Sequence, residues 1–195
     1  MCEPTTDSRA RRALPPQKAT MAGFTMLELT VAIALMALLA SVMLSRFADL
    51  QRAARVGHLQ ALRGAVSAAA TLTHVALMMR ADQPDAVPCA GGGLADNRSR
   101  GAGTLCTDGG LVQTQHGYPA SLALGGHGIV SAAGNAFNAV NTELIANGFS
   151  VSVHGDVTTF ARSDARAPET CSFTYTQALV AEAAAAISVP VTAGC

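Results

Sequence analysis

A single long apolar segment stands out near the start of the chain. Residues 29–44, LTVAIALMALLASVML, contain no charged side chain, and between residues 24 and 45 the only charge is that of Glu28. The hydrocarbon core of a bilayer is about 30 Å thick, and about 20 apolar helical residues cross it. The pattern therefore predicts a transmembrane helix over residues 24–45.

The helical pattern continues beyond this apolar segment. Residues 47–80 contain no proline, and the sequence Asp82-Gln83-Pro84 ends the run. Apolar residues recur at spacings of roughly three and four, which predicts one amphipathic face: Phe47, Leu50, Ala54, Leu62, Val66, Ala69, Leu72 and Val75. We expect residues 46–82 to extend the first helix. One helix over residues 24–80 is about 85 Å long, at about 1.5 Å per residue.

The rest of the chain, residues 83–195, predicts a small antiparallel sheet. Alternation of apolar and polar residues indicates strands at 149–153, 157–160 and 172–176. Residues 154–156 suit a hairpin turn, residues 89–110 are glycine-rich and predict a loop, and the alanine-rich residues 179–187 fit a helix or a strand. Pro190 suits a sheet edge. The pattern predicts an α+β fold, with the sheet packed on the second half of the long helix.

Composition and charge exclude two classes of protein. Half of the 195 residues are hydrophobic, which argues against a disordered chain. The formal net charge is zero, which argues against a nucleic-acid-binding protein, so no nucleic-acid partner is predicted. Only 13% of the residues are charged and 4% are aromatic, so we expect a modest core in residues 83–195.

The first 23 residues are basic and precede the apolar segment. Their charged residues are Glu3, Asp7, Arg9, Arg11, Arg12 and Lys18, a net charge of +2. A basic flank stays in the cytoplasm, so the C-terminal part is expected to face outward. A secretory signal has its small-residue cleavage site after the apolar region, but here Ala22-Gly23 comes before it. Cleavage after Gly23 would leave the apolar helix on the mature chain, which would contain nine arginines and eleven acidic residues. The alternative is that the segment is an uncleaved signal anchor.

The sequence GFTMLEL at residues 23–29 resembles the class III signal of type IV prepilins and type II secretion pseudopilins. The family pattern is Gly, an aromatic residue or Met, Thr, two apolar residues and Glu, followed by an apolar helix. The resemblance implies that residues 1–23 are a leader, which a prepilin peptidase removes between Gly23 and Phe24. The same enzyme is then expected to N-methylate Phe24. The leader is long for this family, and Met21 is an alternative start.

Glu28 is a carboxylate inside the apolar segment, which makes it a functional candidate. One interpretation is that it reaches the cytoplasmic interface and has no role. The other is that, in an assembled filament, Glu28 of one subunit neutralises the Phe24 amine of a neighbour, since an unpaired charge is costly in an apolar surrounding. The matching Glu has this role in the family.

Five cysteines are present, and Cys2 would leave with the leader. The other four lie beyond the apolar helix, where disulfides persist if this part faces outward. Three pairings are open. Pairing of sequence neighbours gives Cys89–Cys106 and Cys171–Cys195, and each bond would then contribute about 3 kcal/mol. A zinc site is disfavoured because no C-x-x-C spacing occurs and the five histidines are scattered, so no metal or other cofactor is predicted.

Two further sets of residues narrow the resemblance. Residues 46–51, 54–55 and 62–65 are similar to the early exposed helix of MSHA-type (mannose-sensitive haemagglutinin) pilins. Gly117-Tyr118-Pro119, residues 171–175 and the final Gly194-Cys195 are also similar to that group. The resemblance implies the type IV pilin fold, with residues 83–195 as a disulfide-stabilised head. It also implies that the last disulfide closes the C-terminal loop.

The resemblance implies a structural subunit of a type IV pilus, for surface attachment, rather than an enzyme. Its expected partners are the prepilin peptidase/methyltransferase, other pilin subunits and the inner-membrane assembly platform. The chain would cross the inner membrane once, with its N-terminus cytoplasmic and its head periplasmic, before joining an extracellular pilus. A type II secretion pseudopilin is the alternative.

A membrane-anchored enzyme is a remote alternative. His116, His127 or His154 would have to meet Asp108, Asp156 or Asp164, and no spacing in the sequence favours such a group. Residues 91–93 and 125–126 are glycine runs without the context of a phosphate-binding loop.

Overall fold

The computed structural model describes residues 25–122, 126–133 and 144–195. The expected leader, with Gly23 and Phe24, lies outside the described residues. The chain is α+β, as predicted, with one long N-terminal helix followed by antiparallel sheets. It divides into two compact units, Met1–Ser45 and Arg46–Cys195.

Helix α1 spans Met26–Arg80 and confirms the long helix predicted from the sequence. It ends at Arg80, as in the predicted helix over residues 24–80, and residues 81 and 82 of the expected extension lie in the turn that follows. Ala81 and Asp82 have positive φ angles of 49° and 59°, a left-handed conformation that stops the helical hydrogen-bond ladder. The Gln83 amide then donates a 2.9 Å hydrogen bond to the Arg80 carbonyl and closes the turn.

A three-stranded antiparallel sheet follows the helix, with strand order β1-β2-β3. Its strands are β1 (Ala102–Thr107), β2 (Gly110–Gln115) and β3 (Tyr118–Pro119). The prediction of a loop over residues 89–110 was therefore wrong for its last third. The two-residue turn at Asp108-Gly109 pairs Thr107 with Gly110, and Leu105 and Val112 are buried on one face. Glycines in and beside β1 interrupt the alternation of apolar and polar residues, so the sequence pattern did not predict this strand.

A four-stranded antiparallel sheet forms the C-terminal part, with strand order β4-β5-β6-β7. Its strands are β4 (Phe149–His154), β5 (Val157–Arg162), β6 (Ser172–Thr176) and β7 (Ala186–Ile187). The predicted hairpin is confirmed, with Gly155 in the turn at φ +55°. Residues 179–187 were expected to form a helix or a strand. Only Ala186 and Ile187 form a strand, the short β7, which pairs with β6. Val191, next to Pro190, makes an isolated bridge to Ser172 at this edge.

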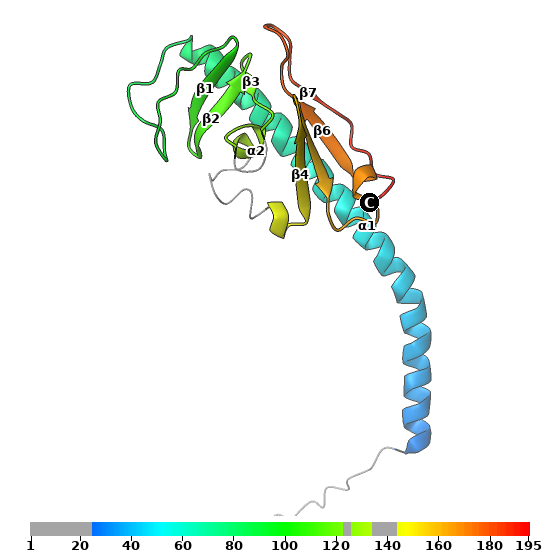
Figure 1. The fold of residues 1–195 in the computed structure, drawn as a ribbon. Coiled ribbons are helices and arrows are strands. Elements are labelled where there is room, and N and C mark those ends of the chain that lie inside the picture. The colour runs from blue at the N-terminus through cyan, green and yellow to red at the C-terminus, as the bar shows by residue number, and fades with distance from the viewer. Residues whose placement is uncertain (1–24, 123–125, 134–143) are drawn as a thin grey trace, which may run out of the picture. The chain divides into compact units, whose positions relative to one another are not determined.

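Besides the helical residues 144–146, two short helical elements lie among the described residues of the second unit. Helix α2 spans Ile129–Ala132, and its Ile129 and Val130 are buried. The 3₁₀ helix η1 spans Pro168–Thr170 and connects β5 to β6. In the second unit, the four-stranded sheet covers the middle of α1 and the three-stranded sheet lies near its C-terminal end (Figure 1).

The hydrophobic core lies between α1 and the four-stranded sheet. Leu59 and Val66 are fully buried on the helix and belong to one cluster with Phe160, Phe173 and Tyr175. The rings of Phe160 and Phe173 are stacked, with centroids 5.0 Å apart. Burial of these large side chains is the main favourable contribution to folding of the second unit.

The single amphipathic face predicted for residues 46–82 was wrong. Val66 and Ala69 are buried and Leu62 is half-buried, but Phe47, Leu50, Ala54, Leu72 and Val75 are exposed. The helix has two apolar faces. The buried face contains Leu59, Val66, Ala70 and Leu77. Apolar residues on both faces recur every three or four positions, and alanines lie on both, so the sequence pattern could not assign each residue to its face.

Candidate functional site

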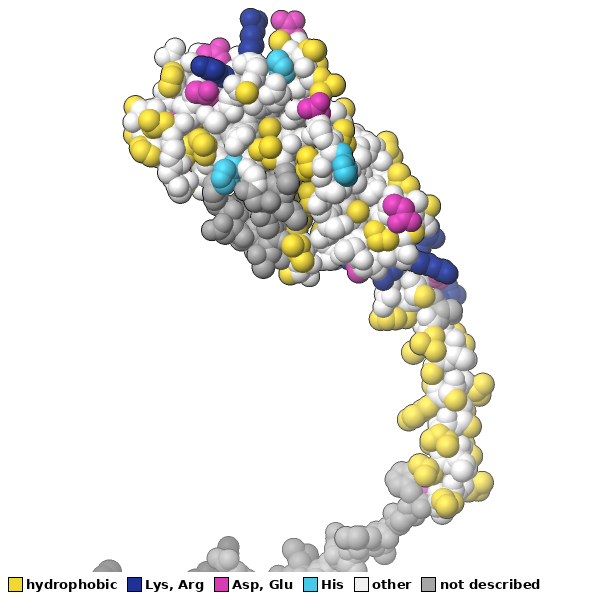
Figure 2. Space-filling view, viewed as in Figure 1, with side chains coloured by type: hydrophobic (Ala, Val, Ile, Leu, Met, Phe, Trp, Pro, Cys, Tyr) yellow, Lys and Arg dark blue, Asp and Glu magenta, His cyan; other side chains and the backbone are white. Residues whose placement is uncertain are grey.

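The first part of α1, within the first unit, presents apolar side chains that are exposed. Its large hydrophobic residues are all exposed, from 52% for Val31 to 82% for Met26. Figure 2 shows hydrophobic side chains along this stretch of the helix, with few charges between them. By length and composition, α1 is the one helix among the described residues that can cross a membrane. Such a surface is costly in water and favourable in a bilayer or against other apolar helices.

Thr25 caps the N-terminal end of this helix and fixes the position of Glu28. The Glu28 amide donates to the Thr25 hydroxyl oxygen at 3.2 Å, and the Leu29 amide donates to the Thr25 carbonyl at 3.2 Å. Thr25 is thus the N-cap and Glu28 lies three residues later, the spacing of a capping box. A carboxylate in the first turn is also favoured by the helix dipole. The sequence analysis missed this role, although the T-x-x-E spacing signals it.

A second exposed apolar face continues along α1 in the second unit. Its larger members are Phe47, Leu50, Leu72, Val75 and Met79. Exposed small residues lie between them at helical spacing: Ala54, Gly57, Ala61, Ala65 and Ala68. A Cβ placed on Gly57 would meet no atom within 4 Å, so none of the described residues of the second unit approaches this face there. The middle of this face consists of alanine and glycine, and none of the residues named on it is charged, which suits close approach by another helix.

The disulfide Cys171–Cys195 closes the C-terminal segment against the core. Cys171 is fully buried, and both sulfurs belong to the core cluster. The Gly194 amide donates to the Thr170 carbonyl, and a Cβ on Gly194 would collide with Thr170 and the Ala167 carbonyl. Only glycine fits beside Cys195 for this reason. Arg63, on α1, donates through Nε to the Ser188 carbonyl at 2.8 Å and holds the same segment to the helix.

The disulfide Cys89–Cys106 ties the loop after α1 to strand β1. A buried polar network supports it. Arg80 donates to Asp85 at 3.0 Å, to Asn97 Oδ1 at 3.1 Å and to the Cys106 carbonyl at 3.1 Å. Asn97 is fully buried and its amide donates to Asp85 and to the Gln83 carbonyl. Both disulfides expected from pairing of sequence neighbours are therefore present: Cys89–Cys106 joins the loop after α1 to β1, and Cys171–Cys195 joins the C-terminal segment to the residue before β6.

Of the candidate residues of the enzyme alternative, His154 and Asp156 share the β4–β5 hairpin, and the others lie on separate elements. His116 is in the β2–β3 turn, His154 ends β4, and Asp108 is in the β1–β2 turn. Across the described residues, no group of three or more His, Cys, Asp or Glu side chains is arranged to hold a metal ion. Asp164 lies beside Arg162. Its burial raises its pKa, but the hydrogen bonds and charge of Arg162 outweigh that effect and lower the pKa below the usual value.

No family model, curated protein or solved structure matches this chain. The membrane-capable helix, the capped Glu28 and the two disulfides are features of the structure. The cleavage site at Gly23 and Phe24 and the pairing of Glu28 with a neighbouring Phe24 amine stay predictions from the sequence.

Proposed function

We propose that this chain is a structural subunit of a type IV pilus, similar to MSHA-type pilins, that serves surface attachment. The observation that carries the proposal is the uncovered apolar helix from Met26 to Leu44, with one carboxylate, Glu28, in its first turn. A bilayer covers such a surface before assembly, and the helices of other subunits cover it afterwards. A soluble enzyme has no use for it.

In this proposal, the peptidase/methyltransferase cleaves after Gly23 and methylates Phe24. The new amine would be four residues before Glu28 in the sequence. When the helix leaves the membrane for the filament, both groups enter an apolar surrounding where an unpaired charge is strongly disfavoured. Glu28 of one subunit then pairs with the Phe24 amine of the next, so the pair favours assembly and also selects the axial register.

The two disulfides support the proposed topology. Disulfides persist in the periplasm and outside the cell, and they are rare in the cytoplasm. All four cysteines lie in the second unit, on the C-terminal side of the apolar helix. The basic residues 1–23 would remain cytoplasmic. Together these favour one membrane crossing in the inner membrane, a periplasmic second unit, and delivery by the assembly platform to an extracellular filament.

The second apolar face of α1 supports assembly through the whole helix. Phe47, Leu50, Leu72 and Met79 lie on the side of the helix away from the core and are more than half exposed. If α1 packs in a filament core, this face is buried between subunits while the opposite face keeps its sheet.

The experiment compares two carboxylate variants on α1, Glu28→Ala and the matched control Asp49→Ala, in the native host. Asp49 is exposed and lies outside the uncharged stretch. We expect Glu28→Ala to be processed and inserted in the membrane but to be absent from sheared surface filaments, while Asp49→Ala is incorporated. Wild-type incorporation of Glu28→Ala would contradict the proposal. Filaments confined to the periplasm when all subunits are intact would favour the secretion pseudopilin instead.

The intact mass of the filament protein tests the processing step separately. The mass is expected to begin at Phe24 and to include one added methyl group. A chain that begins before Gly23 and carries no methyl group would exclude processing by a prepilin peptidase.

A further inference from the structure

An open hollow of about 550 Å³ lies beside the Cys89–Cys106 disulfide of the second unit. It is lined by Arg80 at the end of α1, by residues 85–90 of the loop that follows, and by residues 106–108 at the end of β1 and in the turn after it. Both cysteines of the pair therefore border a space that a small molecule can enter. The filament assembly proposed above makes no use of this hollow.

The two disulfides of the second unit differ in their surroundings. Cys171 is fully buried and Cys195 is 6% exposed, and both belong to the core cluster. Cys106 is half-buried, and neither it nor Cys89 belongs to that cluster. In thiol–disulfide exchange a thiolate must reach one of the two sulfur atoms, so access affects the rate. Exchange is therefore favoured at Cys89–Cys106 and disfavoured at the core disulfide.

The loop after α1 is closed at its base without help from the disulfide. The Asp85 amide donates to the Ala95 carbonyl at 2.9 Å and so joins the two ends of the loop. The Asp85 carboxylate is held as well, by the polar network with Arg80 and Asn97. Opening of the disulfide would leave this base in place, so its effect is confined to residues 86–94.

Residues 86–94 have few other contacts that hold them to the second unit. Val87 is 72% exposed and Leu94 is 58% exposed. The Cys89 amide donates to the Gly93 carbonyl at 2.8 Å, and the Gly92 amide donates to the Cys89 carbonyl at 2.9 Å, so both bonds lie within the segment. No hydrogen bond joins the segment to any other described residue. The disulfide is its covalent tie to β1, and exchange at that bond frees it.

The charge around the bond discriminates between thiols. The charged side chains that line the hollow are those of Arg80, Asp85 and Asp108. Arg80 pairs with Asp85 at 3.0 Å, so the exposed Asp108 leaves the lining with one negative charge in excess. Glutathione brings an excess carboxylate, which Asp108 repels, whereas cysteamine brings an ammonium group. A thiol without net negative charge therefore reaches the bond more readily.

We propose that Cys89–Cys106 is a site of thiol–disulfide exchange for thiols without net negative charge, and that exchange releases residues 86–94. A thiolate attacks Sγ of Cys106, the more exposed partner, and a new sulfur–sulfur bond forms as the Cys89–Cys106 bond breaks. The electron pair of the broken bond stays on Cys89 Sγ, which takes a proton from water. A second thiolate then attacks the sulfur of the added thiol, Cys106 leaves as a thiolate, and two thiols have been oxidised to one disulfide.

The experiment measures exchange by mass spectrometry on the full chain in detergent, and it does not depend on pilus assembly. The probes are cysteamine and glutathione at low ionic strength and at equal concentrations of the thiolate form. Acid quenching and alkylation of the free cysteines then identify which pair has opened. We expect Cys89–Cys106 to open at least about tenfold faster than Cys171–Cys195, and faster with cysteamine than with glutathione. Equal opening of the two pairs, or earlier opening of Cys171–Cys195, would overturn the proposal.

Hydrogen exchange on the opened protein tests the release of the segment. The amides of Cys89 and Gly92 are hydrogen-bonded in the closed state and should lose their protection. The amides of β1 and β2 and that of Asp85 should keep theirs. Protection of Cys89 and Gly92 that survives opening, or a loss that spreads through both strands, would show that the disulfide does not control this segment alone.

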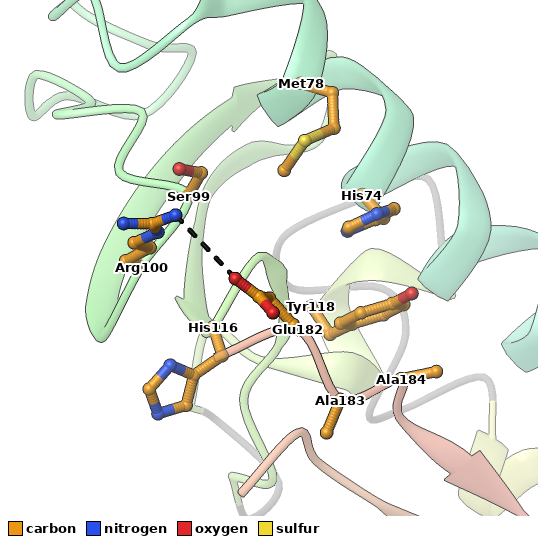
Figure 3. Close-up of a pocket in the computed structure, with 9 residues that line it drawn as sticks. All are labelled: His74, Met78, Ser99, Arg100, His116, Tyr118, Glu182, Ala183 and Ala184. Atoms are coloured by element: carbon orange, nitrogen blue, oxygen red, sulfur yellow. Dashed lines mark ion pairs between the residues drawn. The ribbon is translucent and has the colours of Figure 1, made fainter. Parts of the chain in front are cut away.

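Asp108→Asn tests the discrimination by charge. Removing the carboxylate should speed opening by glutathione about threefold and leave the rate with cysteamine nearly unchanged. Glu182→Gln is the matched control, because Glu182 lines a different hollow with His74 and Arg100, and no cysteine lines that hollow. Figure 3 shows Glu182 reaching toward Arg100 there. An equal effect of both variants on the glutathione rate, or none of Asp108→Asn, would overturn the selectivity assigned to the hollow beside Cys89–Cys106.

Discussion

Arg55, on α1, donates a hydrogen bond of 3.1 Å from Nη1 to the carbonyl oxygen of Cys195. Its Nε also lies 3.5 Å from the carboxylate of Asp164, in the loop after β5. One half-buried side chain thus joins the helix to two loops that are 31 residues apart in the sequence. This contact closes the end of the core that contains the Cys171–Cys195 disulfide.

Arg55→Ala is expected to lower the free energy of unfolding by about 1–2 kcal/mol, because the Cys195 carbonyl loses a charged donor and Asp164 loses one of its two arginines. Chemical denaturation of the full chain in detergent measures the loss. Arg52→Ala is the control, since Arg52 is an exposed arginine on the same helix. A loss as large for Arg52→Ala as for Arg55→Ala would contradict the role given to Arg55.

The two disulfides are expected to differ in importance. Each closes a loop of similar length, and replacing either pair by alanine costs about 3 kcal/mol by loop entropy. The Cys171–Cys195 pair also fills part of the core, so its removal adds the cost of a cavity. The unfolding midpoint of the Cys171→Ala/Cys195→Ala variant should therefore be lower than that of the Cys89→Ala/Cys106→Ala variant. The opposite order would mean that the first loop, not the C-terminal one, limits stability.

Asp96 is expected to make the second unit sensitive to acid. Burial raises its pKa, but this effect is outweighed by hydrogen bonds from the Thr104 amide and hydroxyl and by Arg98, so the pKa in the folded chain is lower than usual. A carboxyl with a lowered pKa stabilises the fold above its unfolded pKa of about 4 and loses that contribution as the pH falls through the folded value.

The variant Asp96→Asn tests this acid dependence. At pH 7 it should unfold at lower denaturant concentration than the wild type, and the difference should narrow progressively below about pH 4. Denaturation midpoints at several pH values between 7 and 2.5 measure the effect. A difference that stays constant over this range would show that the Asp96 charge does not contribute.

The elements that could be predicted from the sequence are those with an unbroken local pattern. Helix α1 has no proline over its length, and β4, β5 and β6 alternate clearly around a glycine turn. Strand β1 was missed because its partner β2 lies next to it in a glycine-rich region, and pairing rather than propensity stabilises it. The two apolar faces of α1 could not be separated, because only tertiary packing decides which alanines are buried.

The same distinction applies to the candidate functional residues: those with an unusual local pattern could be predicted, and those that only the fold brings together could not. Glu28 could be identified because it is the only charged residue in the apolar segment. The four paired cysteines could be identified because all of them lie beyond that segment, where disulfides were expected. The hollow lined by His74, Arg100 and Glu182 was not predictable, since these residues are far apart in the sequence and only the fold brings them together. The contact of Arg55 with Cys195 was not predictable either, because it depends on closure of the C-terminal segment.

Gly117 is expected to tolerate alanine less well than Gly155 does. Both have positive φ angles, +84° and +55°, so alanine is strained at either position by about 1 kcal/mol. At Gly117 a Cβ would also lie 3.2 Å from His74 Nδ1 and 3.2 Å from the Ser99 carbonyl, whereas at Gly155 it would meet nothing within 4 Å. Thermal unfolding should show a larger loss for Gly117→Ala. Equal losses would indicate that strain alone, and not the close approach of the turn to α1, makes glycine necessary there.

Tyr175 is expected to link the two sheets through one hydrogen bond. Its side chain is fully buried, and its hydroxyl donates to the Pro119 carbonyl of β3 at 2.7 Å. Burial, together with the nearby Tyr118, raises the pKa of the Tyr175 phenol, so the hydroxyl stays protonated as a donor through the alkaline range in which tyrosines usually ionise.

Tyr175→Phe removes this donor and leaves the carbonyl without it, which should cost about 1–2 kcal/mol of unfolding free energy. Tyr118→Phe is the matched control, because it keeps the ring that stacks on His74 and removes only a hydroxyl. Denaturation of both variants decides the point: if Tyr175→Phe is as stable as Tyr118→Phe, packing of the ring, and not its hydrogen bond to Pro119, holds the sheets together.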